Sequence, residues 1–203
     1  MVCKHTGDQL PVLTCLDCTT SGATASIVPH KGVNDYAQAE LRRFILEWAR
    51  NDAVLQTDQE NSIMALARAV ATSINIALRQ APKYSSESQG SVERFHSTLW
   101  AMVRTLLLVV RTNYGVELRM TDDLVTWAVK HAVWLYNRYQ VHSDGQTSYA
   151  RRWGKHYSRP IVTWAETIMF RRPGPPTTKT DIWWDYGIWV GKCTNSEEHF
   201  VLT

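Results

Sequence analysis

The sequence lacks the features of a secreted or membrane-spanning protein. No apolar run in its 203 residues reaches the ~18 that cross a bilayer, and no signal peptide opens the chain. We therefore expect a soluble, intracellular protein without a membrane partner. The length suits one domain with a proper hydrophobic core and a small appendix.

Cysteine is scarce, and its pattern excludes a disulfide scaffold. The four cysteines, Cys3, Cys15, Cys18 and Cys193, show none of the paired spacings of small secreted domains. Cys15 and Cys18 have metal-ligand spacing, but no second Cys or His pair lies nearby, and a structural zinc site needs four ligands. We interpret both as ordinary strand residues.

The chain also lacks a strong charge of either sign. The net charge is +3, with nine Lys/Arg against ten Asp/Glu in residues 1–100 and thirteen against nine in residues 101–203. The basic excess in the second half permits contact with phosphates, although such an excess is common on solvated surfaces.

Apolar runs and helical repeats alternate along the chain in the order of a mixed α/β fold. We predict strands at 10–16, 23–28, 52–55 and 76–78, and helices at 36–50, 61–74, 91–113 and 122–140. Residues 79–89, rich in serine and followed by Gly90, predict a mobile loop.

The remainder predicts a separate small unit. Residues 1–143 would form the core domain and 144–160 a connector, and 161–203 would form a small barrel-like β-domain, complete or incomplete at its end. Short strands are expected there at 161–164, 167–170, 182–184 and 187–191, separated by Pro/Gly and Asn-Ser turns.

Two carboxylates stand out against this background. Asp58 follows the strand at 52–55, and Glu93 lies in the first turn of the helix after the loop, with 34 residues (59–92) between them. Mg²⁺ takes one or two carboxylates plus substrate phosphates, so the pair suits phosphoryl transfer on nucleic acid with two metal ions. Alternatively, Asp58 caps the following helix and Glu93 interacts with a helix dipole.

Three segments, in order, resemble the catalytic core of retroviral and retrotransposon integrases, the DDE-type family. Gln89-Gly90-Ser91-Val92-Glu93 is similar to that family's Gln/Asn-Gly-x-Val-Glu signature, and residues 55–58 to its strand-then-Asp segment. Residues 20–29 resemble its second and third strands. The resemblance covers roughly residues 9–140, and 183–203 resembles the small β-domain of copia-type elements.

This resemblance implies the fold, the activity and the partners. The fold would be an RNase-H-like mixed sheet flanked by helices, followed by a small C-terminal β-domain. Asp58 and Glu93 would hold Mg²⁺ or Mn²⁺ for 3′-end processing and strand transfer. The partners would be retroelement DNA ends, target DNA and further copies of the chain, in the nucleus or the cytoplasm.

One departure from the family pattern bears on activity. By the family's spacing the first catalytic Asp would fall at Lys4, and residues 1–4 contain no acid. Asp8 in a turn and Asp17 at a strand end are the nearest acids. We expect that the chain starts past the first Asp, so that its first strand is missing or incomplete and the isolated chain is inactive.

Several further residues are candidate nucleic-acid contacts. Gly90 would allow close approach of DNA to the backbone, unless 79–89 is simply a flexible loop. The candidates are Gln89, Gly90, Arg94, His96, Arg151 and Arg152, with Lys155, Arg171 and Arg172 as further basic positions. For the arginines, a solvated basic surface is the alternative.

Two other classes of function remain open. The chain could be a nucleic-acid-binding RNase-H-like remnant without catalysis, or an interaction protein that dimerises through its long apolar helices. Trp183, Trp184 and Trp189 suit the packing of the small β-domain, although tryptophan can also stack on bases. His131, on an apolar helix face, is expected to be a hydrogen-bonded core histidine.

Overall fold

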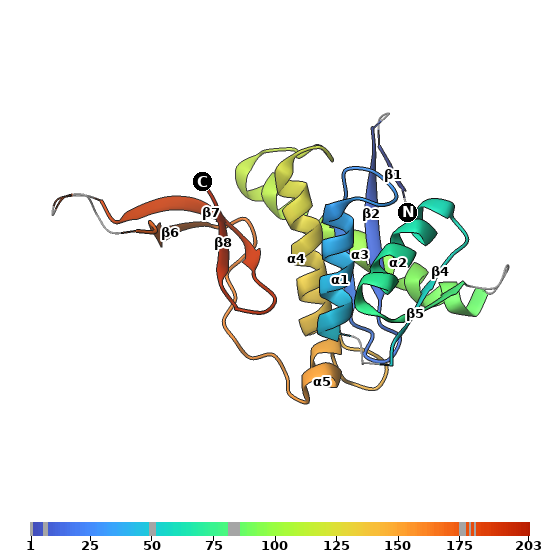
Figure 1. The fold of residues 1–203 in the computed structure, drawn as a ribbon. Coiled ribbons are helices and arrows are strands. Elements are labelled where there is room, and N and C mark those ends of the chain that lie inside the picture. The colour runs from blue at the N-terminus through green and yellow to red at the C-terminus, as the bar shows by residue number, and fades with distance from the viewer. Residues whose placement is uncertain are drawn as a thin grey trace.

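A strand that is buried on both faces organises the structure (Figure 1). In this computed structural model, which describes residues 2–5, 8–48, 52–80, 86–174, 178, 180 and 182–203, Val12 and Leu13 lie side by side on β2, Asp8–Leu16. They are 5% and 6% exposed. Because successive side chains of a strand point to opposite faces, β2 needs a layer of helices on each side.

The strands form three small sheets. Strands β1 (Val2–His5), β2 and β3 (Ala23–Ile27) pair antiparallel, and β4 (Val54–Thr57) pairs parallel with β5 (Ala77–Gln80). The third sheet is antiparallel, in the order β6 (Thr167–Arg171), β7 (Trp184–Lys192) and β8 (His199–Leu202). Strands are thus found at all four positions expected in the core.

Four long helices and one short helix cover the sheets. They are α1 (Asp35–Trp48), α2 (Asn61–Ile74), α3 (Ser86–Tyr114), α4 (Asp123–Tyr139) and α5 (Ser148–Trp153). The apolar faces of α1 and α2 pack with Leu13, whereas α3 and α4 pack with Val12. Among the described residues, none of the helices combines the length and apolarity needed to cross a bilayer.

Helix α4 is fixed to the edge of the sheet by one amide side chain. Asn137 Nδ2 donates to the carbonyl of Ala23 at 2.8 Å, and its Oδ1 accepts from the Ala23 amide, also at 2.8 Å. Asn137 is 4% exposed. These two hydrogen bonds satisfy the N–H and the C=O of Ala23, as a neighbouring strand would. Asn137 of α4 thus continues the hydrogen bonding of the sheet.

The C-terminal sheet packs on α4 through aromatic rings. Trp189 of β7 is fully buried, and its indole N–H donates to His199 Nδ1 at 2.8 Å. His131 of α4 lies edge-on to the Trp189 ring, with centroids 5.2 Å apart, and stacks on Trp134 and Trp164. These rings join the C-terminal sheet to the core containing α3 and α4.

The prediction that His131 is hydrogen-bonded is wrong for one ring nitrogen. His131 is 3% exposed, and its Nδ1 has no hydrogen-bond partner among the described residues. Three indole rings pack against the imidazole. Burial, together with the charge of Arg138, lowers the pKa of His131 to about 4, so the ring is neutral near pH 7.

The C-terminal region differs from the sequence prediction in three respects. Residues 161–164 form no strand, although Trp164 is buried, and the two strands expected at 182–184 and 187–191 are parts of one strand, β7. Trp183 and Trp184 are exposed where packing was predicted. Trp184 projects from the side of β7 opposite to Trp189, and only the Trp189 side meets α4, whereas Trp183 lies before the strand begins. The expected connector contains α5.

The start of α3 is a further correction. A loop was expected through residue 89, but α3 begins at Ser86, so that Gln89 and Gly90 are helical. Serine and acidic residues are favoured at helix starts, and a single glycine costs a helix only about 1 kcal/mol relative to alanine. The helix therefore extends backward through Gly90, while residues 81–85 lie outside the described part of the chain.

Gly22 and Gly90 provide a matched pair for testing the packing. A Cβ at Gly22 would lie 2.1 Å from the Trp48 ring, whereas a Cβ at Gly90 would make ordinary contact with Arg94 at 3.5 Å. We expect Gly22→Ala to lower the free energy of unfolding by about 1–3 kcal/mol, and Gly90→Ala to raise it by about 0.5–1 kcal/mol. Urea denaturation measures both, and a neutral Gly22→Ala would contradict the packing of Trp48.

The buried His131 predicts a loss of stability in acid. Its unfolded-state pKa is about 6.5. The unfolded chain therefore binds more protons between that pH and about 4, and stability falls as the pH falls. The loss by pH 4 should be on the order of 3 kcal/mol. In urea titrations from pH 7 to 4, His131→Leu should flatten the curve, whereas exposed His156→Gln should follow the unsubstituted chain.

Candidate metal and nucleic-acid site

Asp58 lies at the carboxyl end of β4 and is exposed to solvent. Its Oδ1 accepts a hydrogen bond from the Glu60 amide at 3.2 Å, and this bond holds the turn before α2. The N-cap of α2 is Glu60, without a side-chain cap bond. The alternative interpretation of Asp58 as the cap of α2 is therefore wrong, and one carboxylate oxygen carries no hydrogen bond to the described residues.

Parallel pairing brings the end of β5 beside Asp58. Thr57 and Gln80 are partners at the ends of β4 and β5, so the chain leaves β5 beside Asp58 and enters α3 at Ser86 (Figure 1). Glu93 lies two turns into α3 and is exposed. Because α3 starts earlier than predicted, Glu93 is outside the first turn, where the helix dipole acts.

The two carboxylates meet part of the requirement for a divalent metal. Carboxylate oxygens are the ligands that Mg²⁺ and Mn²⁺ prefer, and Mg²⁺ commonly takes one or two of them together with substrate phosphates. Among the described residues, no group of three His, Cys, Asp or Glu side chains could hold a metal ion. Asp17, one of the nearest acids to the expected first ligand, accepts instead from the Thr20 amide at 2.9 Å in the β2–β3 turn.

Glu60, the acid nearest Asp58 in sequence, has its own partners. Its Oε1 lies 2.8 Å from Lys31 Nζ and accepts from the Ser62 hydroxyl at 2.7 Å. The hydrogen bond from Lys31, with that from Ser62, lowers the pKa of the Glu60 carboxyl. Glu60 therefore differs from Asp58 and Glu93, for which the structure shows no ion pair among the described residues.

His96 connects the helix that carries Glu93 to the central strand. Its Nε2 lies 2.7 Å from Thr14 Oγ1 on β2, across a half-buried contact. Burial lowers the pKa of His96, and the charge of Glu93 one turn earlier acts in the opposite direction. The predicted nucleic-acid role of His96 stays untested, and the contact that the structure shows is one between helix and sheet.

The other candidates on α3 differ in accessibility. Arg94 is exposed, and the hydrogen bond of its guanidinium to the described residues is the one it donates to Ser91 Oγ at 3.2 Å. Gly90 is half-buried within the helix, and the side chain of Gln89 lies outside the described part of the structure. Of this group, Arg94 is the residue most open to a phosphate.

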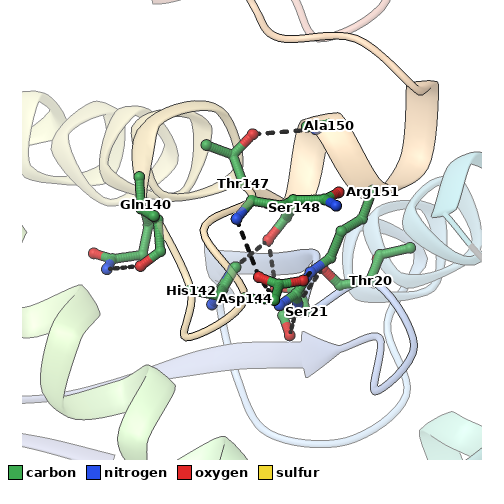
Figure 2. A network of polar contacts seen from close by, with 11 residues as sticks. Thr20, Ser21, Gln140, His142, Asp144, Thr147, Ser148, Ala150 and Arg151 are labelled. Atoms are coloured by element: carbon green, nitrogen blue, oxygen red, sulfur yellow. Dashed lines mark hydrogen bonds and ion pairs between the residues drawn. The ribbon is translucent and has the colours of Figure 1, made fainter.

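Arg151 connects α5 to the β2–β3 turn by hydrogen bonds, as Figure 2 shows. Its guanidinium donates to the Ser21 hydroxyl at 2.7 Å and to the Thr20 carbonyl at 3.2 Å, and it pairs with Asp144 at 2.8 Å. The hydrogen bonds from Arg151 and from the Gln146 amide lower the pKa of Asp144 to about 2. The predicted phosphate contact would compete with these bonds.

The same network contains residues that the sequence analysis missed. Ser148 Oγ donates to the Ser21 carbonyl at 2.9 Å and lies 2.9 Å from His142 Nε2. Thr147 caps α5 by accepting from the Ala150 amide at 3.1 Å. The Asp144-Gly145 turn followed by Thr147-Ser148 is a recognisable helix start, so sequence alone could have predicted α5 but not its contact with Ser21.

Arg152 binds the end of another helix. Its Nε and one terminal nitrogen donate to the Glu47 carbonyl at 3.0 and 2.9 Å, near the end of α1, and its guanidinium lies 4.6 Å from the Trp153 ring centroid. A carbonyl in the last turn of a helix has no partner within the helix, so Arg152 supplies one.

These contacts predict structural roles for Arg151 and Arg152. We expect Arg151→Gln and Arg152→Gln each to lower the free energy of unfolding by about 1–3 kcal/mol, because each leaves carbonyls without their donors. Arg94→Gln, on an exposed helix face, should change it by less than about 0.5 kcal/mol. Chemical denaturation compares the three variants, and equal effects would contradict the assignment.

The comparisons with known proteins rest on structure. No protein-family model matches the sequence, and no curated protein matches it. A chain of the simian T-cell lymphotropic virus intasome, solved with PP2A regulatory subunit B56 gamma, superimposes with a TM-score of 0.58 at 15% identity, over 100% of this chain and 73% of that chain. The HTLV-2 integrase catalytic core domain in complex with magnesium superimposes at 0.57 in a trimeric form and 0.54 in a dimeric form, at 17% and 16% identity, over 75% of this chain and 90% of each of those chains. The chain therefore has the RNase-H-like α/β fold of retroviral integrase catalytic cores, followed by a small C-terminal sheet.

Proposed function

We propose that this chain is the catalytic core of a retroelement integrase, acting on retroelement DNA ends and a DNA target. The observation that carries the proposal is the placement of Asp58 and Glu93. Both are exposed carboxylates, one directly after β4 and one on α3, the helix that follows β5, which is the parallel partner of β4. The fold shared with integrase cores supports the same interpretation.

In this proposal Asp58 and Glu93 together hold Mg²⁺ or Mn²⁺. When bound, the metal would activate a water or a DNA 3′-hydroxyl and stabilise charge on the phosphate under attack in 3′-end processing and strand transfer. The chain itself would orient the two carboxylates, Asp58 through its hydrogen bond with Glu60 and Glu93 through the contact of His96 with Thr14. Arg94 would supply a positive charge for the phosphate. With two carboxylates of the expected three, the isolated chain would be inactive.

Self-association is part of the proposed function. The neighbouring structures include an intasome and trimeric and dimeric forms of an integrase core. We propose that this chain likewise forms homo-oligomers and works in the nucleus, where integration occurs, or in the cytoplasm. Light scattering on the purified chain tests the first point, and a strict monomer would contradict it.

A second candidate function is nucleic-acid binding without catalysis. It is favoured by one observation, namely that no three-ligand group exists among the described residues. Salt-dependent DNA binding that is unchanged by Glu93→Gln, with no strand transfer under any metal condition, would support it.

The metal site is tested by binding as well as by activity. We expect Mn²⁺ to bind the chain weakly, and Asp58→Asn or Glu93→Gln to reduce its affinity at least about tenfold, since even loss of an outer-shell partner typically costs that much. Glu60→Gln is the matched control, because Lys31 and Ser62 already occupy that carboxylate. Water-proton relaxation measures bound Mn²⁺.

The activity assay distinguishes the remaining outcomes. Strand transfer with Mn²⁺ should stay at background in the unsubstituted chain. Turnover that Asp58→Asn abolishes would overturn the prediction of inactivity while supporting the site. Equal Mn²⁺ binding by all three variants would overturn the site itself.

A further inference from the structure

The β6–β7 hairpin exposes an apolar face that the chain does not use for its own packing. Met169, Trp184 and Tyr186 are 55%, 53% and 64% exposed, which is unusual for residues of this size. The opposite face is the one that packs, because Gly187 and Trp189 are buried and Ile168 joins the core. In Figure 1 the two strands extend away from the helical body, so this face is open.

Strand register makes the exposed residues continuous. Met169 pairs with Tyr186, and Arg171 pairs with Trp184, in the antiparallel ladder. Directly opposed residues of an antiparallel pair project from the same face, with Cβ atoms about 4.5–5.5 Å apart. Met169, Arg171, Trp184 and Tyr186 therefore project from one face, and Trp183, which lies before β7, joins this surface through its ring contact with Arg171. These five residues are called the aromatic face.

A cation lies within this aromatic face. The Arg171 guanidinium is 4.3 Å from the centroid of the Trp183 ring, and both residues line an open hollow with Ile182 and Trp184. Arg171 makes no ion pair among the described residues, whereas its neighbour Arg172 is bound to Asp185 at 2.6 Å. Arg171 therefore offers positive charge next to two indole rings.

Exposed aromatic rings beside an arginine that forms no ion pair among the described residues can bind the base and the phosphate of a nucleotide. Bases stack on aromatic side chains whatever their sequence, and a nearby arginine can contact the phosphate. Rings on alternate residues of a strand, as at Trp184 and Tyr186, repeat about every 6.8 Å, which is twice the 3.4 Å separation of stacked bases. A base in a duplex is already stacked on both sides, so this surface suits unpaired nucleotides.

We propose that the aromatic face binds single-stranded nucleic acid by stacking unpaired bases on Trp183, Trp184 and Tyr186, with Arg171 on the phosphate. The inference rests on the proposed function only for the class of partner. It needs neither metal nor catalysis, and it concerns a site on a different sheet from Asp58.

The experiment measures binding of the full chain to a fluorescently labelled twelve-nucleotide oligothymidylate by anisotropy. Two probes of equal length accompany it, an abasic strand with the same phosphates and a duplex. We expect the oligothymidylate to bind tightest, and Trp184→Ala to weaken it about 5- to 150-fold, since one stacked base contributes about 1–3 kcal/mol. Arg171→Gln should reduce the magnitude of the salt slope by about 0.7.

Trp153→Ala is the matched control. Trp153 is 44% exposed and has the Arg152 guanidinium 4.6 Å from its ring centroid, so it is an exposed Trp–Arg pair on α5 rather than on the hairpin. Its substitution should leave binding of the oligothymidylate unchanged. Asp58→Asn should also leave it unchanged, which separates this proposal from the metal site.

Three results would overturn the proposal. One is equal affinity for the abasic strand and the oligothymidylate, which would mean that phosphate contacts alone bind. Another is unchanged binding in Trp184→Ala. The third is no binding of the oligothymidylate; if Trp184→Ala then also converts an oligomer to a monomer by light scattering, the face belongs to self-association.

Discussion

Burial of β2 on both faces is the constraint on which the rest of the structure depends. Val12 needs apolar neighbours on one side of the sheet and Leu13 on the other, so two layers of helices are required. The α3 layer carries Glu93 and reaches β2 through His96, while Asp58 follows β4 in the separate β4–β5 sheet. The helix layers thus determine where the two candidate carboxylates lie.

Several charged side chains in this protein hold parts of the fold together by hydrogen bonds. Arg151 and Arg152 satisfy carbonyls of the β2–β3 turn and of α1, and Asp17 organises a turn. Phosphate contacts were predicted for the two arginines from residue type alone, because a sequence does not show whether an arginine is hydrogen-bonded within the fold. Half-buried carbonyls need donors, and the fold brings these arginines to them.

The C-terminal sheet shows how one strand can divide its residues between two roles. Trp189 faces α4 and is fully buried, whereas Trp184 and Tyr186 lie on the other side and are exposed. Alternation along β7 would have predicted opposite faces for Trp184 and Trp189, but not which face meets the helices. That choice depends on His131 and Trp164, which are distant in sequence and come together only on folding.

The sequence by itself determined the α/β class, the order of the core elements and the bounds of α2, because hydrophobic periodicity and helix-end signals are local. It also singled out Asp58 and Glu93 as metal ligands, which stays a prediction. Only the tertiary structure decided that α3 starts at Ser86, that Arg151 binds Ser21, and that Trp183 and Trp184 are exposed. These outcomes depend on partners far along the chain, and local pattern carries no information about which distant surfaces will meet.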